Sequence, residues 1–183
     1  SQVTAYSLMQ RRQGQKFAAV LMSSTPDLSD LFELRQIART EAVGTRAALA
    51  VQGYKTESKS FPPQISAIRP RWMHELEIDP FNPDRKNGKK PPLEYFVPQT
   101  KEAPGGSSQP YELDVVPFDN GPSFSVKLQS DTFVLYSVGG NKAKDFARRV
   151  QNTGASASGA EYLLWPPVLR LYRQHLLDTG AMK

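Results

Sequence analysis

The chain has 183 residues, which is about the length of one domain and enough to bury a hydrophobic core. Its 23 lysines and arginines exceed its 18 aspartates and glutamates, so the formal net charge is +5, a modest excess that favours anionic partners at long range. The sequence contains no cysteine, which excludes disulfides, thiolate metal sites and cysteine nucleophiles.

We predict that residues 1–28 form an N-terminal arm, or the remnant of a preceding region, and that residues 29–183 form a single α+β domain. The arm contains one apolar run, at residues 17–22, which follows the basic pair Arg11 and Arg12. Six apolar residues fit a buried strand and a short helix equally well, so the run leaves the structure of the arm open.

A long helix is predicted over residues 29–57. Ser29 or Asp27 can cap it, and acidic residues in its first turn oppose the positive end of the helix. Seven residues at helical spacing define the predicted core face: Leu31, Leu34, Ala38, Ala42, Thr45, Leu49 and Gln52. Four more residues widen this face: Ile37, Ala48, Val51 and Tyr54. Close packing of a sheet on this small-residue helix would explain Gly44 and Gly53, each of which weakens a helix by about 1 kcal/mol relative to alanine.

Prolines predict where this helix ends. The Phe-Pro-Pro sequence at 61–63 stops it, because proline lacks the backbone donor and disfavours helical geometry in the preceding residue. A shorter helix is predicted over 64–76, with Pro70 interrupting it or lying in its first turn. The turn-forming residues at 79–84 then predict a rigid surface turn that is anchored by Phe81.

The remainder of the chain predicts an antiparallel sheet and a final helix. Five candidate strands lie at 93–97, 111–116, 123–128, 133–138 and 162–165. Strands this short, separated by loops rich in glycine, proline and serine, fit a meander packed on a helix. An amphipathic helix at 168–178 follows Pro166 and Pro167 and stops at Gly180. The predicted fold class is therefore α+β, with a long N-terminal helix packed on a small antiparallel β-sheet and a C-terminal helix.

Several motifs occur in a fixed order between residues 38 and 167: Arg46-Ala47-Ala48-Leu49-Ala50, Tyr54, Phe61-Pro62, Asp79-Pro80-Phe81, Tyr95, Leu135-Tyr136-Ser137-Val138-Gly139 and Tyr162-Leu163-Leu164-Trp165-Pro166-Pro167. In these motifs and their order the chain resembles the globular domain of the type II secretion pseudopilins. The resemblance implies a pilin-like fold and a non-catalytic structural role, in which the domain contacts other protein subunits of an envelope assembly. It also implies a place in the periplasm or elsewhere on the extracytoplasmic side of the cell envelope, and a preceding membrane segment that is missing from this chain.

The loop after residue 139 departs from the pseudopilin pattern, in which an aspartate- and glycine-rich loop binds calcium in many members. Between residues 139 and 149 this chain has a single carboxylate, Asp145, among four basic residues: Lys142, Lys144, Arg148 and Arg149. Calcium takes about six to eight oxygen ligands, usually including several carboxylates. We therefore expect no cofactor, with Asp145 as the weak candidate for a calcium ligand, and predict that the four basic residues form an interaction surface for a neighbouring subunit.

A second basic cluster supports an alternative function, the binding of nucleic acid or another polyanion. Six basic residues lie close to Trp72 in the sequence: Arg69, Arg71, Arg85, Lys86, Lys89 and Lys90. Basic side chains beside aromatic rings are typical of single-strand binding sites. Turns between a helix and a sheet are also commonly basic, and Trp72 fits a core position equally well. Nucleic acid is therefore the less favoured partner.

Catalysis is not predicted from this sequence. His74 and His175 are the only histidines, and neither is spaced with a nucleophile or with metal ligands. Gly139 and Gly140 fit a bend after a strand better than a phosphate-binding loop. The sequence thus favours a structural protein over an enzyme.

Overall fold

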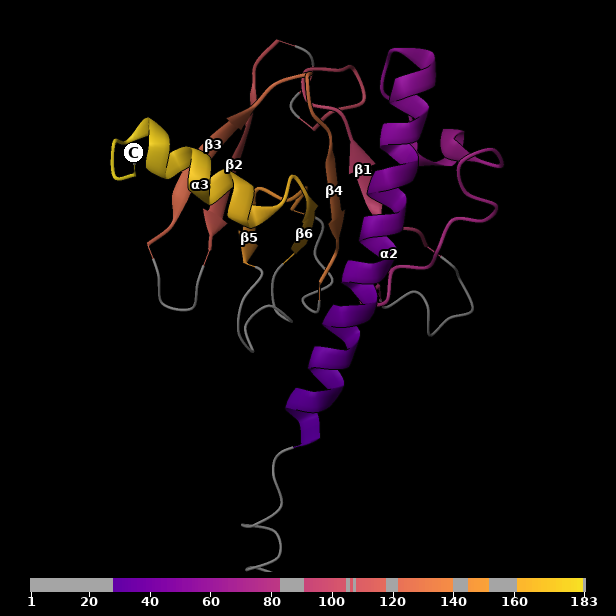
Figure 1. Ribbon diagram of the computed structural model, residues 1–183, viewed down its shortest axis with the longest axis horizontal. Helices are drawn as coiled ribbons and strands as arrows, with labels where there is room; N and C mark the ends of the chain where they lie inside the picture. The colour runs from indigo at the N-terminus through magenta and orange to yellow at the C-terminus, as the bar shows by residue number, and fades with distance from the viewer. Residues whose placement is uncertain are drawn as a thin grey trace, which may run out of the picture. The chain divides into compact units, whose positions relative to one another are not determined.

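The computed structural model describes residues 28–82, 91–104, 106, 108–117, 122–139, 145–151 and 161–182. Over these residues the fold is α+β, as predicted, with a long helix, two three-stranded sheets and a C-terminal helix (Figure 1). The chain divides into two units, residues 1–34 and 35–183. The structure described below is that of the second unit; the predicted arm lies outside the described residues as far as residue 27.

Helix α2 (Leu28–Ser58) confirms the long helix predicted over 29–57. Its buried residues are small or branched at Cβ: Thr40, Val43, Gly44, Ala47, Ala48, Ala50 and Val51. The predicted core face was wrong, because Ala42 and Thr45 are exposed and Leu49 is 67% exposed, although two residues predicted to widen that face are buried. Alanine occurs on every side of this helix, so apolar spacing alone does not single out the face that meets the sheet.

The two glycines of α2 lie where other side chains press against the helix. A Cβ atom added to Gly44 would be 2.5 Å from Cδ2 of Leu164, and one added to Gly53 would be 2.5 Å from Cε3 of Trp72. Neither distance can be accommodated without movement of the neighbour. Close packing therefore explains both glycines, as predicted, but only Gly44 meets the sheet, through Leu164, whereas Gly53 meets Trp72 in the turns after η1.

The first sheet packs against α2. Its strands follow the order β1-β4-β6 with antiparallel pairing, and their bounds are Glu94–Phe96, Val134–Ser137 and Tyr162–Trp165. All of β4 is buried because both of its faces are covered. Phe133 and Leu135 belong to the core shared with α2, whereas Val134 and Tyr136 belong to the core shared with the second sheet.

The second sheet has the strand order β3-β2-β5, with the bounds Phe124–Leu128, Tyr111–Val116 and Arg149–Gln151. β2 and β3 pair antiparallel, whereas β2 and β5 pair parallel. This corrects the prediction of one antiparallel sheet: the predicted strands divide between two sheets, and β5 was not predicted. Only Val150 of β5 is fully buried, and three residues are too few to produce a recognisable period.

The helix predicted over 64–76 is wrong for most of its length. The structure has one short 3₁₀ helix there, η1 (Ile65–Ile68), followed by turns. Pro70 lacks the donor that would continue a helix. Fully buried Ile68 instead anchors the segment, and its carbonyl accepts a hydrogen bond of 3.0 Å from the Trp72 N–H.

The turn predicted at 79–84 forms, as far as its described residues 79–82 show, but Asp79 anchors it rather than Phe81. Asp79 is fully buried, and its Oδ1 atom accepts a hydrogen bond of 3.0 Å from the Phe81 N–H. Its carboxylate also reaches the end of β4, as the Ser137 Oγ donates at 2.7 Å and the Val138 N–H at 3.2 Å. Burial raises the pKa of Asp79, against the effect of these hydrogen bonds.

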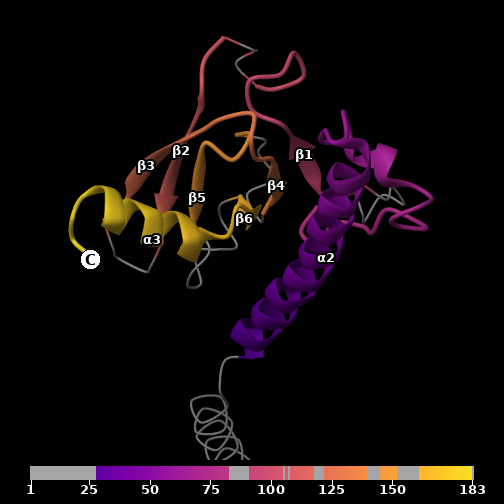
Figure 2. The same ribbon diagram turned by 45° about the horizontal axis from the view of Figure 1, so that its top comes forward.

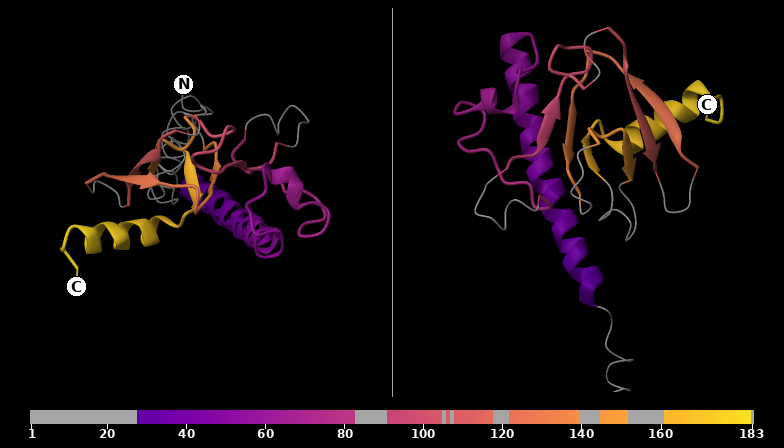
Figure 3. Two further views of the ribbon diagram at one scale, coloured as in Figure 1. Left: turned by 90° about the horizontal axis from the view of Figure 1, so that it is seen from above. Right: turned by 180° about the vertical axis from the view of Figure 1, so that it is seen from behind.

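Helix α3 (Val168–Asp178) has the predicted bounds. Val168 and Leu171 are buried, and Gly180 follows the helix in the left-handed region with φ of 71°. In Figures 2 and 3, α3 lies beside β3 while α2 lies beside β1. Among the described residues, no helix combines the length and the apolar character needed to cross a bilayer.

Candidate interaction groove

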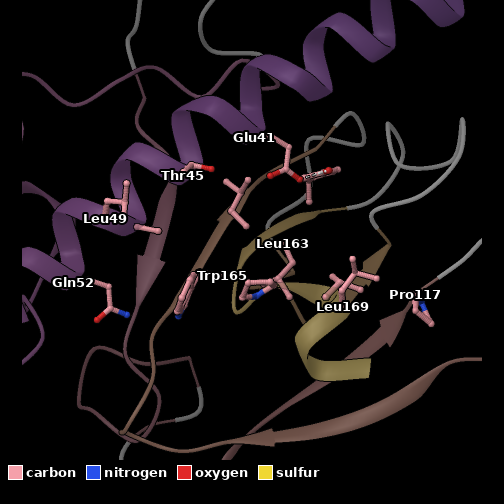
Figure 4. Close-up of a pocket in the computed structure, with 13 residues that line it drawn as sticks. Glu41, Thr45, Leu49, Gln52, Pro117, Leu163, Trp165 and Leu169 are labelled. Atoms are coloured by element: carbon pink, nitrogen blue, oxygen red, sulfur yellow. Dashed lines mark hydrogen bonds between the residues drawn. The ribbon is translucent and has the colours of Figure 1, made fainter. Parts of the chain in front are cut away.

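A groove of about 490 Å³ lies between α2, β6 and the start of α3 (Figure 4). Glu41, Thr45, Leu49 and Gln52 of α2 form one side of it. Leu163, Leu164 and Trp165 of β6 line it as well, together with Val168 and Leu169 at the start of α3. Most of these side chains are apolar, so the groove offers a hydrophobic surface with a few polar groups along α2.

The walls of the groove are held in place by the fold. The Trp165 ring stacks on buried Phe133 with a centroid distance of 5.3 Å and an interplanar angle of 7°. At the Glu41 end, the Tyr162 hydroxyl donates a hydrogen bond of 2.5 Å to Glu41 Oε1. Burial and the neighbouring Glu41 carboxylate both raise the pKa of Tyr162, so its hydroxyl remains a donor at ordinary pH.

Two large apolar side chains beside the groove are exposed. Leu49 of α2 is 67% exposed and Leu169 of α3 is 68% exposed. A single exposed leucine on a protein surface is ordinary, but two that line the same apolar groove add exposed apolar surface of the kind that marks interaction sites. The groove is therefore suited to bind an apolar segment of another protein.

Sequence reasoning identified part of this site but assigned it to the wrong environment. Thr45, Leu49 and Gln52 were predicted to face the sheet, whereas they line the groove. The available signal was the width of the apolar pattern: α2 carries more apolar residues than one buried face needs. Apart from Pro117, the other side of the groove comes from residues 162–169, more than 100 positions later, and no local pattern pairs them with α2.

The predicted interaction residues of the loop after residue 139 are partly described. Lys142 and Lys144 lie outside the described residues, while Arg148 and Arg149 are exposed. Arg149 begins β5 and lies opposite Asp114 of β2 in the parallel register. The structure thus places Arg148 and Arg149 at the edge of the second sheet, away from the groove lining.

Asp145 was the weak candidate for a calcium ligand. Its side chain is exposed, and its backbone N–H donates a hydrogen bond of 2.8 Å to Glu161 Oε1. Among the described residues, no three His, Cys, Asp or Glu side chains are grouped so that they could hold a metal ion. Calcium takes about six to eight oxygen ligands, and residues 140–144 of this loop lie outside the described residues, so the calcium prediction stays a prediction.

The polyanion-binding candidates are brought together only in part. Arg85, Lys86, Lys89 and Lys90 lie outside the described residues. Arg71 forms an ion pair of 2.8 Å with Glu57, and Arg69 Nε donates a hydrogen bond of 3.0 Å to the carbonyl of His74. The Trp72 ring lies against Gly53, with the Arg71 guanidinium 5.9 Å from its centroid. In the described part of this cluster, the basic and aromatic side chains therefore already have protein partners.

The two histidines lie on different elements. His74 is in the turn region after η1, whereas the His175 ring, on α3, stacks on Phe124 at a centroid distance of 4.6 Å. This position gives His175 a packing role.

No family model matches the chain, and comparisons with curated proteins and with solved structures likewise found no match.

Proposed function

We propose that this chain is a non-catalytic assembly domain of a cell-envelope complex, similar in role to the type II secretion pseudopilins, and that it binds an apolar segment of another protein subunit in the groove between α2, β6 and α3. One observation carries the proposal. Helix α2 has one face packed on the sheet, while Leu49 on another side of it is 67% exposed and lies open in the apolar groove, together with Leu169 of α3, which is 68% exposed. A helix that presents apolar residues to solvent beside a preformed groove is typical of protein-interaction surfaces.

The arrangement of the motifs supports the resemblance on which the envelope role rests. The Asp79-Pro80-Phe81 turn and the end of β4 are separated in sequence, yet a buried hydrogen bond joins them through Asp79 and Ser137. The motif at 162–167 contains β6 and leads into α3, beside the groove. The motifs that carry the resemblance thus form one packed unit around a long helix.

Site-directed photo-crosslinking tests the proposal. Because the sequence contains no cysteine, a single Leu49→Cys substitution can be labelled selectively with benzophenone maleimide. Lys127→Cys is the matched control, since Lys127 is also exposed but lies on β3 outside the groove. The labelled proteins are incubated with an envelope extract of the source cells, illuminated and analysed by mass spectrometry.

We expect the label at position 49 to capture a secretion or pilus subunit that the label at position 127 does not capture. Adding Leu169→Arg, on the opposite rim, should abolish this adduct without unfolding the protein, because Leu169 is 68% exposed. Equal capture at both positions, or capture that survives Leu169→Arg, would contradict the groove as the binding site. Capture of nucleic acid in place of protein would favour the polyanion alternative.

A further inference from the structure

The carboxylate of Glu161 occupies the centre of a turn formed by residues 145–148. Glu161 precedes β6 and is 1% exposed. Its Oε1 atom accepts a hydrogen bond of 2.8 Å from the Asp145 N–H, and its Oε2 atom accepts one from the Ala147 N–H. A single buried carboxylate therefore holds the backbone on both sides of Phe146.

This turn has a backbone conformation that requires support. Phe146 and Ala147 both have φ of 58°, in the left-handed region that residues with a side chain seldom adopt. The Arg148 N–H closes the turn with a hydrogen bond of 3.1 Å to the Asp145 carbonyl. On the opposite side, the Tyr111 hydroxyl donates a hydrogen bond of 2.6 Å to the Phe146 carbonyl. Glu161 and Tyr111 together fix a conformation that is unfavourable for these two residues alone.

The charge at the centre of this turn is opposite in sign to the charge at the centre of a calcium loop. A cation is held by oxygen ligands that converge on it, usually carboxylates and carbonyls. Here backbone N–H groups converge on a carboxylate, as they do in the anion-binding concavities called nests. The chain itself supplies the anion, so the turn has an organising charge without a bound ion.

We propose that Glu161 is the positioning residue of the 145–148 turn, taking the organising role that a metal ion has in calcium loops, and that it holds Phe146 and Arg148 at the surface independently of calcium. Phe146 is 44% exposed although it is a large apolar residue, and Arg148 beside it is exposed. An aromatic ring and an arginine on a rigid turn are suited to bind a protein partner. None of the residues of this turn lines the groove, so this inference stands or falls separately from the proposed function.

Amide NMR of the intact chain tests the proposal. In calcium-free buffer above pH 7, where Glu161 is ionised despite its raised pKa, we expect the amide protons of Asp145 and Ala147 to be shifted downfield and protected from exchange, because each is bonded to a carboxylate. A large excess of calcium chloride should leave both signals unchanged. Glu161→Gln should shift both signals upfield and raise their exchange rates by about tenfold to a hundredfold, as expected for loss of a charge-assisted hydrogen bond.

Asp145→Asn is the control variant, because it removes the one carboxylate side chain within the turn while keeping its backbone. It should leave the Ala147 amide signal at its wild-type position and the exchange rates of both amides unchanged, and the amide of Val51, in the core of α2, should not respond to either substitution. Saturable, calcium-dependent shifts at residues 145 and 147, or wild-type signals in Glu161→Gln, would overturn the proposal. If Glu161→Gln does not fold, the calcium titration of the wild-type chain still decides whether the Glu161 carboxylate or a calcium ion organises the turn.

Discussion

The Ser137 hydroxyl donates a hydrogen bond of 2.7 Å to the Asp79 carboxylate, and both residues are completely buried. Ser137 is the last residue of β4, whereas Asp79 begins the turn that follows η1. The bond therefore ties an irregular segment to the central strand of the first sheet. A buried carboxylate is tolerated only when its oxygens have partners, and Ser137 supplies one of them.

We predict that Ser137→Ala lowers the free energy of unfolding by about 1–2 kcal/mol, the range expected when a buried polar group loses its partner. Asp79→Ala should cost more, about 3 kcal/mol, because it leaves the Ser137 hydroxyl and the Phe81 and Val138 N–H groups without their acceptor. Urea denaturation monitored by circular dichroism measures both changes.

The matched control for Ser137→Ala is Ser125→Ala. Ser125 also donates a hydrogen bond to an aspartate, Asp114, but that pair is exposed on the second sheet. We expect its loss to cost less than about 0.5 kcal/mol, since water replaces the partner at an exposed site. Equal losses for the two serine substitutions would show that burial does not determine the importance of the Asp79 bond.

Gly53 is predicted to be required because of Trp72. Gly53→Ala gains about 1 kcal/mol of helix propensity. The added methyl group would nevertheless lie within 2.6 Å of two atoms of the rigid indole ring, and overpacking of this kind costs about 1–3 kcal/mol. We expect a net loss of stability of up to about 2 kcal/mol in urea denaturation.

A double substitution separates the two effects. In a Trp72→Ala background the ring is gone, so Gly53→Ala should stabilise the protein by about 1 kcal/mol. Gly44→Ala gives a second comparison, because its neighbour is the flexible end of the Leu164 side chain and the contact can relax. If Gly53→Ala destabilises the protein equally with and without Trp72, the ring is not the cause.

The sequence predicted the elements of this fold better than their environments. Pro166, Pro167 and Gly180 give α3 its bounds because each acts locally through the backbone. In contrast, the buried face of α2 depends on which of several alanine-rich sides meets the sheet, and that is a tertiary property. The formation of β5 is also a tertiary property, because Arg149, Val150 and Gln151 form a strand only by pairing with β2.

Even less of the candidate groove could be predicted from the sequence. Its polar end is a hydrogen bond between Glu41 and Tyr162, which are 121 residues apart. Only the packing of β6 beside α2 brings them together. Arg148 and Arg149, by comparison, could be identified as exposed because a run of basic residues is seldom buried.

Phe146 is predicted to limit the stability of the fold. Its left-handed backbone conformation disfavours a residue with a bulky side chain, whereas asparagine tolerates this region. We expect Phe146→Asn to raise the free energy of unfolding by about 0.5–1 kcal/mol. Phe146→Leu is the control, because leucine has the same backbone restriction and should give no gain. A loss of more than about 1 kcal/mol in Phe146→Asn would mean that packing of the phenyl ring outweighs the backbone strain.

The stability of the protein should fall as the pH rises from about 4.5 to about 7 because of Glu161. Burial raises the pKa of this carboxyl from 4.5 to about 7, against the opposing effect of its hydrogen bonds from the turn. Between these two values the folded state binds more protons than the unfolded state, so its stability is greatest in acid and is lost as Glu161 ionises. Each pKa unit corresponds to about 1.4 kcal/mol, so the full change is about 3 kcal/mol.

Urea denaturation of the wild type and of Glu161→Gln, at intervals across this range, measures the contribution. The raised pKa of Asp79 acts in the same direction but is present in both proteins, so it cancels in the difference between them. We expect that difference to change steeply between about pH 5 and pH 7 and to be constant above about pH 8. A difference that is constant from pH 5 to pH 7 would show that Glu161 titrates in the folded protein as an ordinary exposed glutamate does.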